Sequence, residues 1–422
     1  MNFNREKMTV IAGKIQSNKY LQALSGGLML SLPLLIIGAI STLLSALPFE
    51  GYQAFIKDAG LKPYFALAAN FTIDLIAFYV AFLVAYRLSE SYEHDALMAG
   101  ITSSIAFLLL TPIGVFDKVK AIPFQWLGAS GLFVAMMVAL LSTYLYMLIV
   151  DKNWVIKMPN GVPPTVTKTF SSIIPILVIL AIFTAINALF SATEFKNIHN
   201  FIYKFLQIPL QHIGGSFWGL CAFIIISQVL WMFGVHGSMV TNVVAKPLLL
   251  SMDIANLAAF KAGEPLPFII SWSFRFLYSL LGGGGCTIGL CLLMAFKAKS
   301  EQLRTIGKIA LPTSFCSINE PLVFGIPIVL NATLAIPYLL TPLLTTSIAY
   351  VLTVMGIVPT PIGIFLPTGS PMLFSAFVQG GITLVILQVF LVAVTIVSYY
   401  PSFKKLDAKK CAEEAAYKDA EV

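Results

Sequence analysis

The sequence predicts an all-helical integral membrane protein, and three observations support this fold class. Residues with apolar side chains make up 58% of the 422-residue chain, and its mean hydropathy is +0.88. Charged residues make up only 11%, against about 25% in an ordinary soluble domain. Long apolar stretches recur along the chain, and a membrane-spanning helix needs about 20 such residues. The composition excludes a cytosolic enzyme, and the length accommodates about ten transmembrane helices.

Regular apolar segments fill the first half of the chain. They predict five spans, at residues 22–47, 66–88, 96–116, 127–150 and 170–192. The basic N-terminus lacks the short apolar core and cleavage site of a signal peptide, so we expect the first span to stay in the membrane. Asp74 is alone in the second span, where it either binds a coupling cation or meets a hydroxyl.

Residues 194–212 differ from the spans around them. Apolar residues recur there at helical spacing, from Phe195 to Leu206, with Glu194, Lys196 and Lys204 between them. This pattern is typical of an amphipathic helix that lies in the membrane interface.

The apolar segments of the second half are interrupted by glycine and proline. They are 214–233, 238–260, 267–295, 309–331, 333–357 and 380–400. Irregular backbone is not tolerated in lipid, so these breaks must face protein or a water-filled cavity. Broken segments of this kind indicate a transporter substrate site. For Gly282–Gly285 we expect close helix packing or a hinge rather than a phosphate cradle, because no GK[ST] follows.

The basic residues lie in short loops and at the ends of the chain, although the net charge of +7 would suit a nucleic-acid binder. The positive-inside rule explains this placement and predicts that both termini are cytoplasmic, in a multi-pass protein of the cell membrane. Residues 151–168 and 297–308 are expected to be basic cytoplasmic loops. The five cysteines show no metal-ligand spacing, and we interpret them as small apolar side chains.

Glu320 is the one charged residue between Ile309 and Phe403. A carboxylate within the membrane is costly and usually functional. Asn319 precedes it, and Pro321 denies a backbone N–H nearby. This combination suits sugar hydroxyls, which both donate and accept hydrogen bonds. The competing interpretation is a carboxyl that caps a broken helix or pairs with Arg275.

His236 is the second isolated titratable group, within the sequence QVLWMFGVHGSMVTN. Imidazole can bind a hydroxyl or act as a base. Gly234 and Gly237 would let a ligand approach the backbone, and Trp231 could stack on a pyranose ring. The alternative is a structural histidine bonded to a carbonyl. For the other histidines, which lie near polar loops, we favour a structural role.

Arg275 lies inside an apolar segment and needs a partner, for which Glu320 and a bound anion are the candidates. No catalytic triad, metal motif or ATP motif is visible, so we expect no cofactor and no metal site. The chain therefore has no means of its own to energise transport with ATP.

The motifs resemble those of a known family. SINEPLVFGIP at 317–327 and W-x-F-G-x-H-G at 231–237 are similar to the membrane-embedded IIC permease of the bacterial phosphotransferase system. The resemblance is strongest to its lactose/cellobiose/diacetylchitobiose family, in the glucose superfamily. YLQALSGGL at 20–28 and PLLIIGAI at 33–40 agree with it, and the resemblance covers essentially the whole chain.

The resemblance implies a fold, partners and roles for individual residues. It implies ten transmembrane helices, two re-entrant hairpins and a homodimer formed through the N-terminal half. The sugar would lie near His236 and Glu320, with Asn319 beside them, and its C6 hydroxyl would be phosphorylated by a phosphocysteine on a separate IIB protein. No IIB-like or IIA-like segment is visible here, so IIB and IIA are expected as separate partners.

One stretch departs from the family pattern. Relatives that take up β-linked disaccharides often have Pro-Trp-Thr-Thr-Pro late in the chain, where this sequence has PTGSP at 367–371. Thr368 stands where a tryptophan would stack on the sugar. Thr368 and Ser370 are therefore expected to contact the sugar, whose identity the departure leaves open.

The sequence thus predicts a sugar permease that is coupled to phosphorylation and translocates a β-linked disaccharide. Whether Glu320 is a base or only binds a hydroxyl stays open, and so does whether the chain counts as an enzyme. A cation-coupled sugar symporter and a receptor-like sugar-binding protein are the alternatives. The expected organisation is a scaffold and dimerisation domain at 1–193, an amphipathic linker helix at 194–212, a transport domain at 213–402 and a cytoplasmic tail at 403–422.

Overall fold

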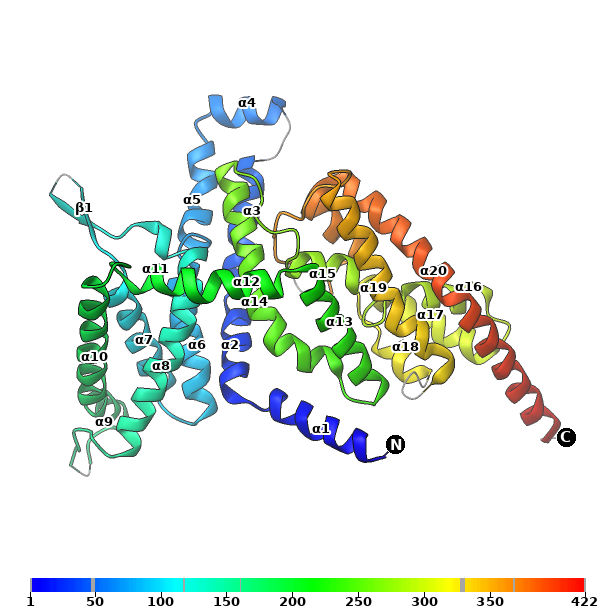
Figure 1. Ribbon diagram of the computed structural model, residues 1–422, viewed down its shortest axis with the longest axis horizontal. Helices are drawn as coiled ribbons and strands as arrows, with labels where there is room; N and C mark the ends of the chain where they lie inside the picture. The colour runs from blue at the N-terminus through cyan, green and yellow to red at the C-terminus, as the bar shows by residue number, and fades with distance from the viewer. Residues whose placement is uncertain are drawn as a thin grey trace. The chain divides into compact units, whose positions relative to one another are not determined.

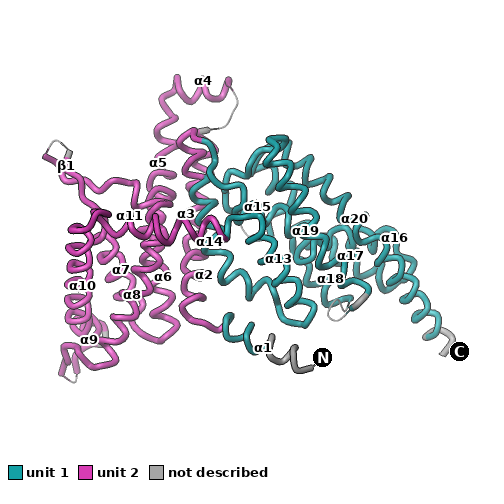
Figure 2. The backbone as a smooth tube through the Cα atoms, viewed as in Figure 1, with its two compact units in different colours: residues 1–16, 214–256, 265–422 teal, residues 17–213, 257–264 magenta. Residues whose placement is uncertain are grey.

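The structure is a computed structural model, and it is almost entirely helical (Figure 1). It describes residues 2–46, 50–116, 118–159, 161–326, 331–366 and 369–420. The chain forms two compact units, which Figure 2 distinguishes by colour. Unit 1 comprises residues 1–16, 214–256 and 265–422, and unit 2 comprises residues 17–213 and 257–264.

Unit 2 consists of apolar helices and one short hairpin. Its helices are α2 (Lys19–Leu30), α3 (Leu32–Ala46), α4 (Glu50–Asp58), α5 (Lys62–Thr72), α6 (Ile76–Ser91), α7 (Ala96–Leu110), α8 (Leu132–Asp151), α9 (Pro164–Ser171), α10 (Ile173–Ser191), α11 (Ile198–Ile202), the π-helix η3 (Tyr203–Gln207) and α12 (Ile208–Gly214). The antiparallel strands β1 (Gly114–Phe116) and β2 (Val119–Ala121) pair Gly114 with Ala121. The 3-10 turns η1 (Phe124–Trp126) and η2 (Ala129–Gly131) lead into α8.

Small residues let the helices of unit 2 pack closely around α6. A Cβ on Gly27 of α2 would lie 2.5 Å from Val84 Cγ2, and one on Gly100 of α7 would lie 2.7 Å from the ring of Phe82. Association of helices in lipid depends on such close packing, because lipid tails compete equally for apolar side chains. The buried face of α6 therefore forms the centre of this unit.

The predicted spans correspond to helices, but the number of candidate membrane-spanning helices differs from the number predicted. Among the residues that the structure describes, seven helices are long and apolar enough to cross a membrane, and eight when the bent pair Ile198–Gly214 and Phe217–Met232 counts as one span. The expected ten therefore stays a prediction. The span expected at 96–116 is too long, because α7 ends at Leu110 and a β-hairpin begins at Gly114.

His199 is fully buried, which agrees with the structural role expected for it. Its ring packs between Phe107 and Trp126, with centroid distances of 5.6 and 5.0 Å. Its Nε2 atom lies 3.3 Å from the hydroxyl of Thr111. These contacts hold α11, the start of the predicted amphipathic segment, against the end of α7.

Asp74 is not alone within its span, since it forms an ion pair with Lys261. Asp74 lies between α5 and α6, and Lys261 lies in the last turn of α14 (Gly237–Ala262). The side chains retain 28% and 18% exposure, so the pair is partly shielded from solvent. The expected coupling-cation or hydroxyl contact at Asp74 is therefore wrong, because its partner is a lysine that is distant in sequence.

Unit 1 contains the interrupted segments. Its helices are α1 (Asn2–Gln16), α13 (Phe217–Met232), α14, α15 (Trp272–Ser279), α16 (Ile288–Lys297), α17 (Glu301–Phe315), α18 (Glu320–Gly325), α19 (Ala332–Val354) and α20 (Met372–Ala420). Helix α14 passes from unit 1 into unit 2 after residue 256. Helix α20 has non-helical backbone at Gly380 and Gly381, where two helices meet across a kink.

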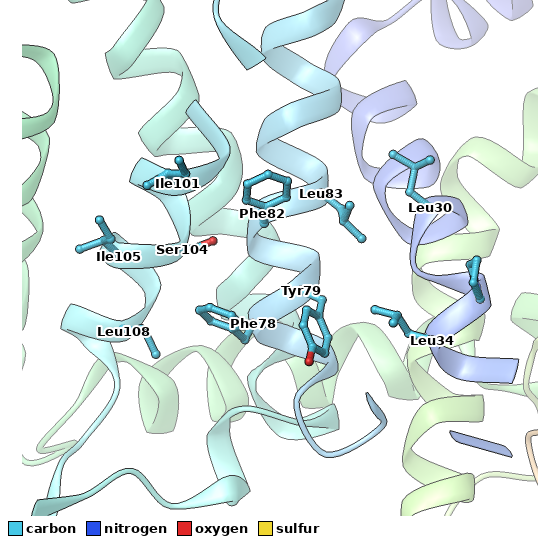
Figure 3. Close-up of a pocket in the computed structure, with 11 residues that line it drawn as sticks. Leu30, Leu34, Phe78, Tyr79, Phe82, Leu83, Ile101, Ser104, Ile105 and Leu108 are labelled. Atoms are coloured by element: carbon cyan, nitrogen blue, oxygen red, sulfur yellow. The ribbon is translucent and has the colours of Figure 1, made fainter. Parts of the chain in front are cut away.

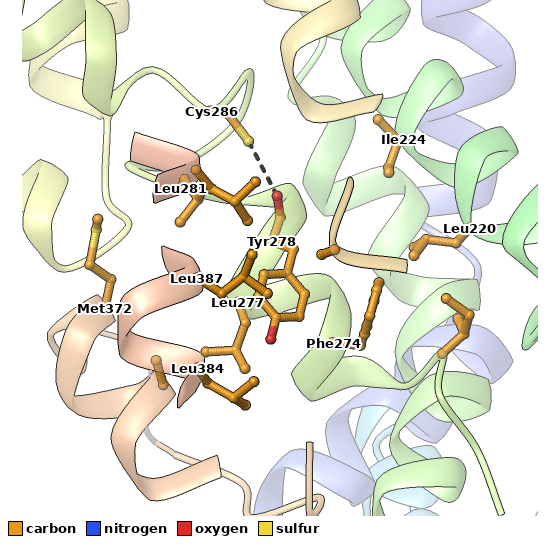
Figure 4. Close-up of a cluster of buried hydrophobic side chains, with 14 of the residues drawn as sticks. Leu220, Ile224, Phe274, Leu277, Tyr278, Leu281, Cys286, Met372, Leu384 and Leu387 are labelled. Carbon is orange, nitrogen blue, oxygen red and sulfur yellow. Dashed lines mark hydrogen bonds between the residues drawn. The ribbon is translucent and has the colours of Figure 1, made fainter. Parts of the chain in front are cut away.

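A buried cluster joins α13, α15 and α20 (Figure 4). Phe274 and Tyr278 of α15 meet edge to face with centroids 4.8 Å apart, and Leu384 and Leu387 of α20 belong to the same cluster. The thiol of Cys286 donates to the Tyr278 carbonyl, as the dashed line shows. Cys221, Cys286 and Cys291 are buried and free, which confirms their interpretation as apolar side chains, whereas Cys316 and Cys411 are half-buried.

Side-chain amides satisfy the irregular backbone before α20. The Gln379 amide oxygen accepts from the N–H groups of Gly363 and Ile364, and its nitrogen donates to the Ile364 carbonyl and to Ser273. Asn256 binds both backbone groups of Phe268 in the same way. Unsatisfied backbone groups are costly away from water, so these amides make the helix breaks tolerable.

The basic loop expected at 297–308 is largely helical. Helix α16 runs to Lys297 and α17 begins at Glu301, which leaves a connection of three residues. Asp407 of α20 accepts from the N–H groups of Lys299 and Ser300, and Glu414 accepts from the Ser300 hydroxyl at 2.6 Å. Carboxylates stabilise the N-terminus of a helix, so the end of α20 caps α17.

We predict that Asp74 and Lys261 stabilise unit 2 as a coupled pair. Asp74→Asn and Lys261→Met should each lower the free energy of unfolding by about 1–3 kcal/mol, because each leaves a partly buried charge without its partner. The double variant should cost less than the sum of the two single changes. Thermal unfolding of the purified variants measures this, and purely additive losses would contradict the pairing.

Candidate functional site

A tight turn between α13 and α14 presents His236. Gly234 has φ +83°, a left-handed conformation that glycine adopts without steric cost. A Cβ on Gly237 would lie 1.8 Å from the Ser227 carbonyl oxygen, so only glycine fits at the start of α14. Both glycines therefore shape the turn around His236. At Gly237 the backbone of α14 lies close to the backbone of Ser227. The sequence instead suggested that these glycines let a ligand approach the backbone.

The hydrogen bonds of His236 define which ring nitrogen carries its proton in the neutral form. Nδ1 accepts from the backbone N–H of Met239 at 3.2 Å. A neutral imidazole that accepts at Nδ1 carries its proton at Nε2. The Trp231 ring packs against the imidazole, with centroids 4.3 Å apart, and fixes its orientation. His236 therefore presents an N–H donor at Nε2.

Glu320 faces this donor from another helix. It is the first residue of α18, and its Oε1 atom lies 4.0 Å from His236 Nε2. This distance is too long for a hydrogen bond, and a hydroxyl can bridge it. The side chains of His236 and Glu320 are 35% and 47% exposed, so a ligand can reach both. The structure thus brings together two groups that are 84 residues apart in the sequence.

Asn319 links this pair to the run of four glycines. Its amide nitrogen donates to the Gly284 carbonyl at 2.7 Å and to the Thr287 hydroxyl at 3.0 Å. Gly283 has φ +93°, and a Cβ there would lie 2.5 Å from the Asn319 side chain. The run is therefore a turn that holds Asn319. The expected close packing against a helix is present, because a Cβ on Gly285 would lie 2.3 Å from the Tyr338 ring of α19, and the hinge stays a prediction.

Three buried polar atoms converge near Gly284 and have no hydrogen-bond partner in the described chain. They are Tyr338 Oη, Trp231 Nε1 and Gln228 Oε1. They lie 3.2, 3.6 and 3.9 Å from the place of a Cβ on Gly284. Buried polar groups usually have a hydrogen-bond partner, so a cluster of buried polar atoms without one is typical of a functional site. Gln228 and Tyr338 are not among the site residues that the sequence predicts, because their only signal is a polar group within an apolar segment.

Arg275 has a different partner from the two that the sequence suggested. Its Nη1 atom donates to Asn242 Oδ1 at 2.6 Å, and its guanidinium lies 5.1 Å from the centroid of the Trp272 ring. It is 2% exposed. Glu320 is not its partner among the described contacts, and the Arg275 Nε atom has no hydrogen-bond partner among the described residues. Arg275 is therefore placed beside α14.

The remaining predicted residues lie before α20. Ser370 is partly buried and two residues from the start of that helix. Thr368 lies outside the described residues. Within the described parts of the chain, no cluster of three or more His, Cys, Asp or Glu side chains could hold a metal ion.

These observations first define a class of protein. Apolar helices long enough to span a membrane lead to broken helices, whose ends bring a carboxylate, an imidazole and an amide to one accessible place. This arrangement is typical of a membrane transporter that binds a polar solute.

The particular family follows from comparison with known proteins. The family model "Phosphotransferase system, EIIC" matches residues 25–342, and the chain belongs to this family. The chain is 37% identical to the lichenan permease IIC component of Bacillus subtilis (strain 168), covering 97% of this chain and 94% of that protein. It is also 37% identical to the cellobiose-specific EIIC component of Geobacillus stearothermophilus, covering 97% and 95%.

A solved structure agrees in fold. The crystal structure of the transporter ChbC, the IIC component of the N,N'-diacetylchitobiose-specific phosphotransferase system, matches with a TM-score of 0.91 at 36% identity, covering 98% of this chain and 99% of that one. The chain is therefore a multi-pass membrane permease of the IIC type, and it works with a sugar and with IIB and IIA proteins. Its membership does not favour the cation-coupled symporter.

We predict that Gly283→Ala removes Asn319 from its position. The new Cβ would collide with the Asn319 side chain, whereas Gly356 has a similar φ of +71° with nothing within 4 Å of its Cβ. Gly356→Ala should therefore cost only backbone strain, about 1–2 kcal/mol. Gly283→Ala should in addition abolish sugar binding, measured by equilibrium binding of labelled sugar. Equal binding by the two variants would show that the turn does not position Asn319.

Proposed function

We propose that the chain binds a β-linked disaccharide at His236 and Glu320 and presents its C6 hydroxyl for phosphorylation by a separate IIB protein. The observation that carries this proposal is the 4.0 Å separation of His236 Nε2 and Glu320 Oε1. An oxygen about 2.8 Å from each atom fits between them. It would accept from the imidazole N–H and donate to the carboxylate, as only a hydroxyl or a water molecule does.

This geometry supports a role for each group. Glu320 accepts the hydroxyl proton as the oxygen attacks the phosphorus of the phosphocysteine, and the phosphorus–sulfur bond breaks to leave the IIB thiolate. His236 Nε2 holds the attacking oxygen. Once Glu320 has released this proton to water, its carboxylate repels the new negative charge of the phosphorylated sugar, and this repulsion favours release of the product.

Asn319 and the three polar atoms near Gly284 that lack hydrogen-bond partners would bind the other hydroxyls of the sugar ring. Tyr338 and Trp231 each offer a donor, and Gln228 offers an acceptor, to hydroxyls of the sugar. Ser370, Arg275 and Thr368 are proposed to contact the more distant part of the sugar.

The names of the relatives support the choice of a β-linked disaccharide. One curated relative is named a lichenan permease and the other is named cellobiose-specific, and ChbC belongs to a diacetylchitobiose-specific phosphotransferase system. Relatives that take up β-linked disaccharides often have tryptophan where this sequence has Thr368, and this difference supports a different second-ring subsite. We therefore propose a cellobiose-like sugar as the first substrate to test.

We further propose the surroundings of the permease. Both termini face the cytoplasm of a bacterial cell, because the basic residues gather at the ends. Phosphorylated IIB docks near Lys299 and Arg304, beside the connection that Asp407 and Glu414 cap. Two copies associate through the domain at 1–193, and the domain at 213–402 moves as the transport unit, with 194–212 as linker and 403–422 as cytoplasmic tail.

We predict that Glu320→Gln lowers phosphorylation of the transported sugar at least about 100-fold, the usual contribution of a general base. The measurement is uptake of labelled cellobiose, lactose and diacetylchitobiose into cells that carry the chain with or without IIB, followed by assay of sugar phosphate. Glu264→Gln, at an exposed carboxylate, is the control and should behave as the wild type. Phosphorylated sugar that appears without IIB, or unmodified sugar that accumulates under a cation gradient, would contradict the proposal.

We predict that Tyr338→Phe weakens sugar binding without affecting the chemical step. Loss of one hydrogen bond to the sugar should raise KM about 5- to 20-fold and leave kcat unchanged. Tyr350→Phe on the same helix is the control, because the Tyr350 ring stacks on Phe217 and keeps that contact. An unchanged KM for Tyr338→Phe would show that the buried hydroxyl does not reach the sugar.

A further inference from the structure

Unit 2 contains an apolar groove with a volume of about 660 Å³ (Figure 3). One wall is formed by the end of α2 and the start of α3, at Leu30 and Pro33. The other walls are α6 and α7. Leu30 and Ile101 lie toward one end of the close-up, and Leu34 and Leu108 lie toward the other. Helices α2, α3 and α6 belong to segments long and apolar enough to cross a membrane, and α7 is a shorter apolar helix. The groove between them therefore lies at the depth of hydrocarbon.

The groove has no polar group available for a polar ligand. Two of its lining residues carry hydroxyls, and both are bonded to backbone. The Ser104 hydroxyl donates to the Gly100 carbonyl at 3.0 Å, and the Tyr79 hydroxyl donates to the Phe71 carbonyl at 2.9 Å. A sugar or a chain of water molecules would lose its own hydrogen bonds on entry. The lining therefore selects hydrocarbon.

Two cations lie beyond one end of the groove. Arg87 follows the groove residue Leu83 by one turn of α6, and its Nε lies 3.2 Å from the place of a Cβ on Gly26, one turn before Leu30. Lys19 Nζ donates to the carbonyl of Ser91, one turn further along α6.

The surroundings of the two cations mark the edge of the membrane. Tyr92 lies under Lys19 Nζ at 4.0 Å and meets Tyr20 edge to face. Tyrosine rings beside cations are typical of the level of lipid headgroups. The described partner of Arg87 is Glu90, which binds one nitrogen, Nη1, at 2.6 Å, and a guanidinium has five N–H donors. The local charge of these three side chains stays positive, with two cations against one carboxylate.

The depth of the groove matches one leaflet of a bilayer. Leu83 and Phe78 lie four and nine residues before Arg87 on α6, which is about 6 and 14 Å along the helix axis. Half of the hydrocarbon thickness is about 15 Å. A chain that starts at the headgroup level near Arg87 therefore runs along the groove and ends near its far wall.

We propose that this groove holds one acyl chain of an anionic phospholipid, whose phosphate lies at Lys19 and Arg87. The lining is apolar and its two hydroxyls are already hydrogen-bonded, so it suits an acyl chain. The two cations at one end match a negatively charged headgroup. The depth of the groove matches one leaflet, on the side of the membrane where α2 begins. This site is independent of the sugar site.

Native mass spectrometry of the full chain, loaded with dioleoyl phosphatidylglycerol or dioleoyl phosphatidylcholine, tests the proposal. We expect one retained phosphatidylglycerol per chain. Ile105→Trp, which fills the groove, should lower its occupancy about tenfold, whereas Leu177→Trp on the exposed face of α10 should not. Lys19→Gln and Arg87→Gln together should weaken phosphatidylglycerol binding about 25-fold, at about fivefold for each cation. Lys120→Gln in the hairpin is the matched control.

A second measurement on the unaltered chain covers the case in which a variant fails to fold. Phosphatidylglycerol with a diazirine on one acyl chain should label peptides of α3, α6 and α7 that line the groove. Equal retention in Ile105→Trp and Leu177→Trp, or labelling spread evenly over α10, would overturn the proposal. So would equal binding of the two lipids, or a dimer lost in Ile105→Trp with lipid binding unchanged, since a second copy of the chain would then cover the groove.

Discussion

The interrupted backbone between α15 and α16 is the constraint on which the transport unit depends. Carbonyl groups left without helical partners cannot remain unsatisfied away from water. Side chains supply the donors. Thr287 binds the nearby Gly282, and the other donors come from distant segments: Gln388 binds Leu277, Thr345 binds Tyr278, Asn319 binds Gly284 and Tyr399 binds Gly285. The same bonds that make the break tolerable therefore place Asn319, and with it Glu320.

The candidate site is a consequence of that arrangement. Glu320 follows Asn319 directly, so the bond from Asn319 to the glycine turn fixes where the carboxylate starts. His236 is fixed separately, by Met239 and by the Trp231 ring. Glu320 and His236 are thus held by separate contacts, and a sugar hydroxyl can bind between them and leave again without any change in the surrounding fold. Such a site suits a permease, which must bind and release its sugar in every cycle.

Unit 2 is built on a different principle. Its helices approach closely through glycines, and its few polar groups are used internally, as in the ion pair of Asp74 with Lys261 and the contact of His199 with Thr111. None of these groups needs a ligand. The groove beside α6 is consistent with this, because its two hydroxyls are already bonded to backbone and leave it suited to hydrocarbon.

The sequence by itself determined the membrane class, most of the apolar segments and the two isolated titratable groups, because hydropathy and the rarity of charge are local properties. It also supplied the motif around Glu320 that resembles the IIC family. Only the tertiary structure decided the partners. Lys261 for Asp74, Asn242 for Arg275, and Gln228 with Tyr338 near Gly284 are all brought together by chain segments far apart in sequence. Hydrogen bonds and ion pairs depend on distances of a few ångströms, and no pattern along one chain encodes those distances.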